Sequence, residues 1–144
     1  MKSETERSPR PSDLIRSPAA GARYPPSTIN QMLAASVQRF AAAPAILAPD
    51  REALTYAGLG HQLDEAAREL AAAGYGRRSR IAVSLPNGPE SAVAVLAVSG
   101  CVTCAPLSPD EDENALFGLL VAMRIDALIA PEHAESTAVS AARR

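Results

Sequence analysis

The segment from Ala82 to Pro109 limits the possible folds of this chain more than any other part. It reads AVSLPNGPESAVAVLAVSGCVTCAPLSP: a short apolar run, a Pro-Asn turn, an apolar stretch of helical length that ends at Gly100, and a second short apolar run. Short apolar runs are typical of strands covered on both faces, and parallel strands need a crossover such as the helix between them. The segment therefore predicts a strand, a helix and a parallel strand, with the first strand, Ile81 to Leu85, at the centre of a sheet.

Local signals define where the helix of this unit begins. Pro86 cannot donate to a strand ladder, so the first strand ends there. Asn87 or Gly88 is placed to cap the helix, and Pro89 suits its first turn, where no N–H donor is needed. Glu90 then interacts favourably with the helix dipole.

Two further strands and another helix follow. We expect strands at Thr103 to Leu107 and Ile125 to Ala130, with a helix between them that begins at the acidic run Asp110 to Glu113. The apolar positions of this helix are Leu116, Leu119, Leu120 and Met123. The alternation of strands and helices implies right-handed crossovers and an open, mostly parallel α/β sheet with helices on both faces. After the last strand, only a weak Ala-rich segment remains.

The residues before this sheet predict a helix and a hairpin. Thr28 and Gln31 have the spacing of a capping box, which predicts a helix that ends near Ala42. Its predicted buried face is Leu33, Val37 and Phe40. Apolar runs at Ala45 to Ala48 and Ala53 to Tyr56, separated by a Pro-Asp turn, predict a small hairpin.

A second, longer helix follows the hairpin. Thr55 is placed to cap it, and Gly74 supplies the left-handed residue that ends it. Its predicted buried stripe is Leu59, Leu63, Ala66, Leu70 and Ala73. Its predicted solvent face is Gln62, Asp64, Glu65, Arg68 and Glu69.

The chain of 144 residues is long enough for one modest domain but short for a two-domain enzyme. Residues 1–27 are rich in Ser, Pro and Arg and lack a sustained apolar period, so we interpret them as a disordered leader. Their Ser-Pro sites also allow a phosphorylation or docking role, although a solvated extension is the more ordinary interpretation. Residues 28–144 then form a single, incomplete α/β domain.

Charge and composition argue against several classes of protein. A net charge of −2 and a pI near 5.7 give no broad electrostatic reason to bind nucleic acid or an anionic membrane. No apolar run reaches the roughly 18 residues of a membrane span, and no signal-peptide pattern follows Lys2, so we expect a cytoplasmic protein. Two cysteines do not make a disulfide framework.

Cys101 and Cys104 have the spacing of a thioredoxin-type redox pair. That chemistry places its cysteines at the start of a helix, whereas these follow a helix and enter a strand. If the strand begins at Cys101, the two side chains point to opposite faces. We therefore interpret both as small buried hydrophobic residues. Zinc is disfavoured because only His61 and His133 remain as ligands.

The other candidate motifs fail as well. The segment Gly74-Tyr-Gly-Arg-Arg-Ser precedes a strand and is a turn rather than a dinucleotide-binding loop. Ser99 precedes a glycine but lacks the nucleophile-elbow pattern. His61 is expected on a helix surface, and the acids from Asp110 to Glu113 are expected to complement a helix dipole rather than to hold a metal. We assign no catalytic, cofactor-binding or metal-binding residue within the chain.

Five short motifs, in this order, resemble one enzyme family. They are Pro44-Ala-Ile, Leu54-Thr-Tyr, Arg80-Ile-Ala-Val, Pro86-Asn-Gly-Pro-Glu and Ala105-Pro-Leu. They look like the LTY, DRVA, PNxPE and PLxP landmarks that open the large N-terminal domain of adenylate-forming enzymes, the acyl-CoA synthetase and ligase superfamily. The PNGPE form is most similar to the oxalyl-CoA and 4-coumarate-CoA ligase branches. The resemblance covers roughly Thr28 to Pro131, which is only the first part of a family member.

Several positions depart from the family pattern. Gly58 stands where a glutamate is usual; that glutamate would complete a capping box with Thr55, so we expect a weaker helix start. Cys101 and Ser108 replace the more usual alanine and asparagine or aspartate. The match is also loose from Asp110 to Asp126.

The resemblance implies a ligase that combines ATP and a carboxylic acid into an acyl-adenylate and passes the acyl group to a thiol, as in fatty acid metabolism. ATP, Mg²⁺ and coenzyme A, or a carrier-protein thiol, are then the cofactors and partners of the full-length enzyme. Such chemistry needs a phosphate loop and a catalytic lysine, yet the only lysine is Lys2 and no Gly/Ser/Thr-rich loop occurs. We therefore expect an N-terminal fragment that is inactive alone. The alternative is a stand-alone, non-catalytic α/β binding or interaction module.

Overall fold

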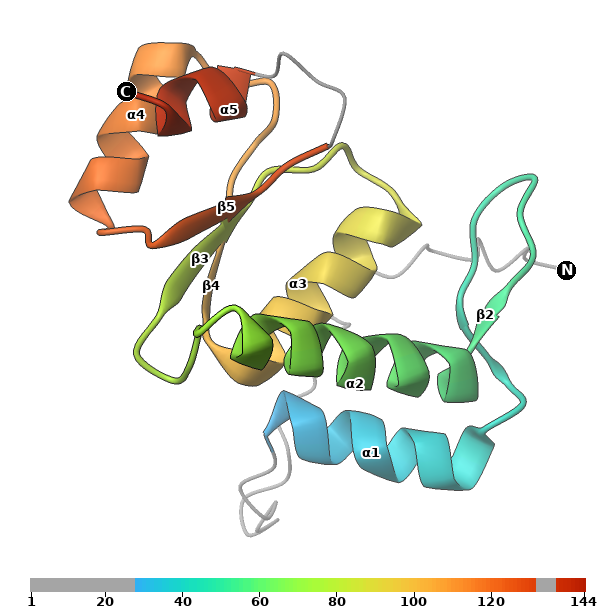
Figure 1. The fold of residues 1–144 in the computed structure, drawn as a ribbon. Coiled ribbons are helices and arrows are strands. Elements are labelled where there is room, and N and C mark those ends of the chain that lie inside the picture. Colours follow the sequence, from blue (N-terminus) through green and yellow to red (C-terminus); the bar gives the residue numbers. More distant parts are fainter. Residues whose placement is uncertain (1–27, 132–136) are drawn as a thin grey trace, which may run out of the picture.

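The centre of the fold is a parallel sheet of three strands in the order β4-β3-β5 (Figure 1). The computed structural model describes residues 28–131 and 137–144, so the predicted leader, residues 1–27, and His133 lie outside the described residues. The strands are β3 (Arg80–Val83), β4 (Thr103–Pro106) and β5 (Ala127–Ile129). Ile81 lies opposite Cys104 on one side and Ala127 on the other, which confirms that this strand is central.

β3 is central because its side chains suit burial on both faces. Ile81, Ala82 and Val83 are each at most 2% exposed. Alternate residues of a strand point to opposite faces, so Ile81 and Val83 share one face of the sheet and Ala82 lies on the other. All three strands are shorter than the sequence predicts, and β5 has only three residues.

One face of the sheet is covered by α3 (Pro89–Cys101) together with the end of α2 (Tyr56–Ala72), which contributes Leu70. We name this side the α3 face. Its buried core is Ile81, Val83, Val98 and Val102. Both helices were predicted, although α3 continues one residue beyond Gly100. Gly74 ends α2 in the predicted left-handed conformation, with φ of 88°.

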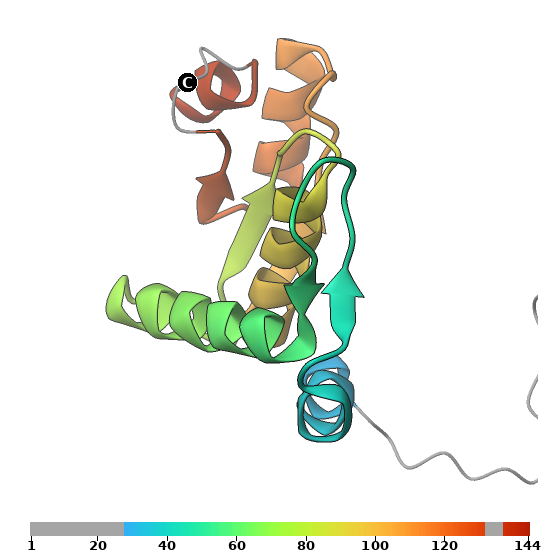
Figure 2. The ribbon, with the colours of Figure 1, turned by 90° about the vertical axis from the view of Figure 1, so that its right-hand side faces the viewer.

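The opposite face is covered by α4 (Glu113–Ala122) and α5 (Thr137–Ala142), and we name it the α4/α5 face. Leu116, Ala138 and Ala141 are its buried residues. Figure 2 shows these two helices together at the end of the molecule away from α1 and α2. The helix α5 was not predicted. Of the predicted apolar positions of α4, Leu119 and Met123 are exposed, at 39% and 37%.

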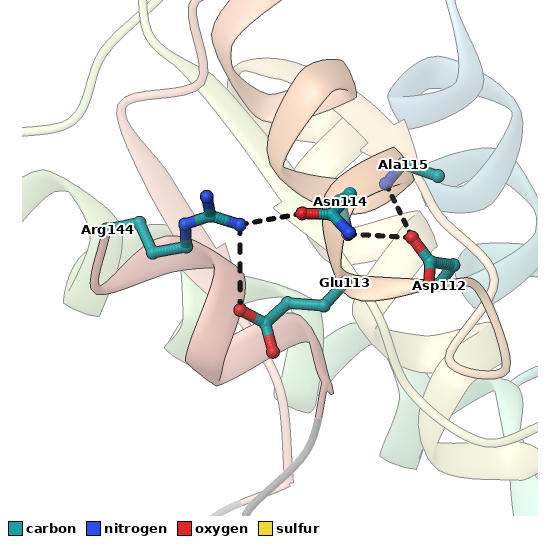
Figure 3. A network of polar contacts seen from close by, with 5 residues as sticks. All are labelled: Asp112, Glu113, Asn114, Ala115 and Arg144. Carbon is teal, nitrogen blue, oxygen red and sulfur yellow. Dashed lines mark hydrogen bonds and ion pairs between the residues drawn. The ribbon is translucent and has the colours of Figure 1, made fainter.

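A polar network joins α4 to the last residue of the chain (Figure 3). Asp112 caps α4, because its Oδ1 accepts hydrogen bonds from the backbone N–H groups of Asn114 and Ala115 at 2.8 and 3.2 Å. Arg144 Nη1 donates to Asn114 Oδ1 at 3.0 Å and lies 3.7 Å from Glu113 Oε1. The Arg144 guanidinium also stacks over the Phe117 ring, 4.7 Å from its centroid.

The first helix, α1 (Ile29–Phe40), packs against α2 and α3. The capping box is confirmed, since Thr28 Oγ1 accepts from the Gln31 N–H at 3.2 Å and Gln31 Oε1 accepts from the Thr28 N–H at 3.1 Å. Asn30 Nδ2 donates to the Gly100 carbonyl at 2.7 Å, and a Cβ at Gly100 would lie only 2.5 Å from Asn30 Oδ1. A side chain at Gly100 would therefore disturb the packing of α1 on α3.

The predicted hairpin is confirmed as an antiparallel pair of short strands, β1 (Pro44–Ile46) and β2 (Leu54–Thr55). Thr55 also caps α2, because its Oγ1 accepts from the Gly58 N–H at 3.1 Å. Phe40 was expected to be buried, but it is 47% exposed and its ring lies 6.4 Å from that of Tyr56. Within residues 28–131 and 137–144, no helix has the length and hydropathy needed to cross a membrane.

Candidate functional site

A groove runs between the β1–β2 hairpin, α2 and α3, and we name it the α2/α3 groove. Its volume is about 620 Å³. Apolar residues from three elements form most of it: Leu54, Ala66, Leu70, Val93, Ala94 and Ala97. Positions three or four apart on a helix share one face, so each helix presents a single row of side chains to the groove. Polar residues also line it: Arg51, Glu52, Gln62, Glu69 and Glu90.

One ion pair bridges the groove from the hairpin to the first turn of α3. Arg51 Nη1 donates to Glu90 Oε1, and the two side chains are 60% and 61% exposed. The backbone N–H of Glu90 and the guanidinium of Arg51 lower the pKa of the Glu90 carboxyl. This carboxylate therefore stays ionised to lower pH than an ordinary glutamate. Because both side chains are exposed to water, the pair contributes little to the stability of the fold.

The carboxyl edge of the sheet is where open α/β proteins ordinarily bind ligands. Val83 lies opposite Pro106, so the segment from Pro86 to Glu90 and the segment from Leu107 to Pro109 leave neighbouring strands at this same edge. Gly88 is the N-cap of α3, one of the two residues predicted, and it has no side chain to cap the helix.

Among the residues that the structure describes, Ser84 at this edge is the one buried polar side chain, and sequence analysis missed it. It directly follows β3 and is 1% exposed, and its N–H donates to the Ile129 carbonyl at 2.9 Å. Its hydroxyl has no hydrogen-bond partner among the described residues. The sequence signal that could have pointed to Ser84 was its hydroxyl, the only polar side chain in the apolar run Ile81 to Leu85. No such signal joined Arg51 to Glu90, which are 39 residues apart.

The structure corrects the prediction for the cysteine pair. Cys101 ends α3 rather than beginning a strand, and Cys104 lies in β4. Opposite faces were expected if the strand began at Cys101; both side chains are instead half-buried and pack against the core of the α3 face. Helical geometry at Cys101 replaces the strand alternation on which that prediction rested.

The remaining candidate residues have structural roles. The His61 side chain lies on the surface of α2, as predicted, and is 74% exposed. Its Nδ1 lies 4.0 Å from Glu65 Oε2. The segment after Gly74 is a turn, in which Ser79 N–H donates to the Gly76 carbonyl at 2.7 Å. Of the acidic run, Asp112 caps α4. Across the part of the chain that the structure describes, no group of three His, Cys, Asp or Glu is arranged to hold a metal ion.

The α2/α3 groove does not fit a nucleoside triphosphate with its Mg²⁺. The polyanionic phosphates would meet the carboxylates of Glu52, Glu69 and Glu90, against one guanidinium that is already paired. We therefore derive no reaction step through ATP from these residues. What the arrangement provides is an apolar surface held in place by the hairpin.

Residues 33–144 match the family of AMP-binding enzymes. This match covers most of the chain, so the chain belongs to that family. No curated protein matches it significantly in sequence.

Solved structures of the same fold agree with this membership. An artificially fused adenylation–PCP di-domain NRPS, NpsA-ThdA from Klebsiella oxytoca, superposes with a TM-score of 0.69 at 20% identity, over 74% of this chain and 20% of that one. The N-terminal subdomain of Klebsiella oxytoca NpsA in complex with anthranilyl-AMSN gives 0.67 at 20% identity, over 74% and 28%. VinN in complex with L-aspartate gives 0.71 at 22% identity, over 81% and 32%.

At these identities the likeness shows the fold: an α/β unit with a parallel sheet flanked by helices, as in the N-terminal portion of adenylate-forming enzymes. The predicted fold class is thereby confirmed. The chain spans between 20% and 32% of the length of these three structures. The narrower assignment to the oxalyl-CoA and 4-coumarate-CoA ligase branches stays a prediction.

Proposed function

We propose that this chain is the opening part of an enzyme that activates a carboxylic acid with ATP, forming an acyl-adenylate and pyrophosphate, and then transfers the acyl group to a thiol. The family match over residues 33–144 carries this proposal. The chain contributes the first parallel strands and the α2/α3 groove, on which the rest of the enzyme is built. The substrate-activating residues come from sequence that these residues do not include.

We further propose that the chain is catalytically inactive alone. An adenylating site needs hydrogen-bond donors around the phosphates and a cation to offset the developing charge. The sole lysine of the sequence is Lys2, and no Gly/Ser/Thr-rich loop is present. The described carboxylates around the α2/α3 groove would repel a triphosphate rather than hold it.

The thiol acceptor is coenzyme A or a carrier-protein thiol. The PNGPE motif that begins at Pro86 favours coenzyme A, because its form is most similar to that of CoA ligases. A carrier protein is the other candidate, because an adenylation domain of the same fold has been studied in an artificial fusion with a PCP domain. We propose a cytoplasmic location in either case.

A stand-alone binding module is the second candidate, and the α4/α5 face favours it. Ala138 and Ala141 of α5 are each 2% exposed, so the second core is closed by residues of this chain. The Arg144 contacts with Glu113 and Asn114 hold α5 in place. A module of this kind should be monomeric and should melt cooperatively.

Two measurements test these proposals. The first is the mass of the native gene product, detected with an antibody against residues 28–144. A product well above 15.0 kDa is expected, and a product of 15.0 kDa would favour the stand-alone module. The second is carboxylate-dependent exchange of pyrophosphate into ATP. Exchange is expected from the longer product and not from the purified 144-residue chain.

The exchange assay also separates the acceptors. After the active acid has been found, coenzyme A and a phosphopantetheine-bearing carrier protein are compared as acyl acceptors. Exchange by the 144-residue chain itself would overturn the proposed inactivity. A longer product that exchanges no pyrophosphate with any acid in a broad panel would contradict the proposed function.

A further inference from the structure

We draw no further inference here: the strongest candidate, the apolar groove of about 660 Å³ formed by α4, β5 and α5, carries none, because the chain spans between 20% and 32% of the length of the three solved structures compared above and nothing in the residues that the structure describes shows what covers this groove.

Discussion

The two faces of the sheet are closed by different kinds of side chain. On the α3 face, four branched aliphatic residues form the core, all between 1% and 8% exposed. On the α4/α5 face, one leucine and two alanines are buried, and the partly buried side chains of Leu107, Phe117, Leu120 and Leu128 pack against them. A core of branched aliphatic residues removes more apolar surface from water than a core of alanines does. The α3 face should therefore carry most of the stability of the chain.

Both faces also have an arginine–carboxylate pair near the start of a helix. Arg51 holds Glu90 at the first turn of α3, and Arg144 holds Glu113 at the first residue of α4. The first pair joins the hairpin to a helix that is already well packed. The second joins the last residue of the chain to α4, with a ring contact added by Phe117. The ion pair between Arg51 and Glu90 is therefore of minor importance for packing on the α3 face. The ion pair between Arg144 and Glu113 is more important for packing on the α4/α5 face.

The largest effect is expected from truncation of the two cores. Ile81→Ala should lower the free energy of unfolding by about 2–5 kcal/mol, because it leaves a cavity at the central strand. Leu116→Ala removes a side chain of similar size that is 0% exposed, but its loss should fall mainly on α4 and α5. Urea denaturation measures the first effect, and hydrogen exchange resolved by segment measures the second.

Ile29→Ala is the control for both truncations, since Ile29 is 47% exposed and its loss should cost under about 0.5 kcal/mol. The comparison between the two faces is wrong if Leu116→Ala accelerates exchange in β3 and α3 as much as in α4 and α5. It is also wrong if Ile81→Ala leaves the midpoint of denaturation unchanged.

A smaller effect is expected when the contacts of Arg144 with α4 are removed. Arg144→Gln deletes the ion pair with Glu113 and the stacking on Phe117, which together should cost about 0.5–2 kcal/mol. Since α5 is at the periphery, exchange of its amides should quicken while exchange in α3 keeps its rate. Arg143→Gln is the neighbouring control. If the two variants give the same exchange rates in α5, the Arg144 network does not hold this helix.

The smallest effect concerns the pair on the α3 face. The pKa of Glu90 is lowered first by its own backbone N–H and then by Arg51, so its contribution to stability is present at neutral pH and is lost as pH falls through the lowered pKa. Arg51→Gln should raise the pKa of Glu90 only part of the way, because the backbone donor remains. Carbon-detected NMR titration of Glu90 checks this, with Arg68→Gln as control. A pKa that returns fully to the ordinary glutamate range would make Arg51 the main cause.

The same difference between the faces explains which parts of the fold were predictable. The α3 face has strong local signals: Pro89 in the first turn of α3 and β-branched residues in β3. A capping box at Thr28 marks the neighbouring helix α1 in the same way. The α5 helix has only alanines at its buried positions, and alanine does not distinguish a buried face from an exposed one. Leu119 and Met123 gave the opposite error: leucine and methionine suggest burial, but both side chains are exposed.

The candidate site was less predictable than the fold. The α2/α3 groove depends on how two helices and a hairpin pack, and no single motif encodes that. Arg51 and Glu90 meet only because the hairpin folds back toward α3. Ser84 was hidden in an apolar run. The family could be recognised from short motifs because those motifs lie in the hairpin, in β3 and β4, and in the turn before α3.

The strand order also fits the direction in which a ribosome makes the chain. β3 emerges first, then β4 and then β5, while the spatial order is β4-β3-β5. The central strand is therefore synthesised before either neighbour, and each later strand has a place beside it that is already formed. Pairing of strands that are distant in sequence makes a parallel sheet slow to fold. Ile81 pairs with Ala127 only after two crossovers. Synthesis from the centre outward gives the nascent chain one pairing to complete at a time, so slowing translation after β4 should favour correct assembly.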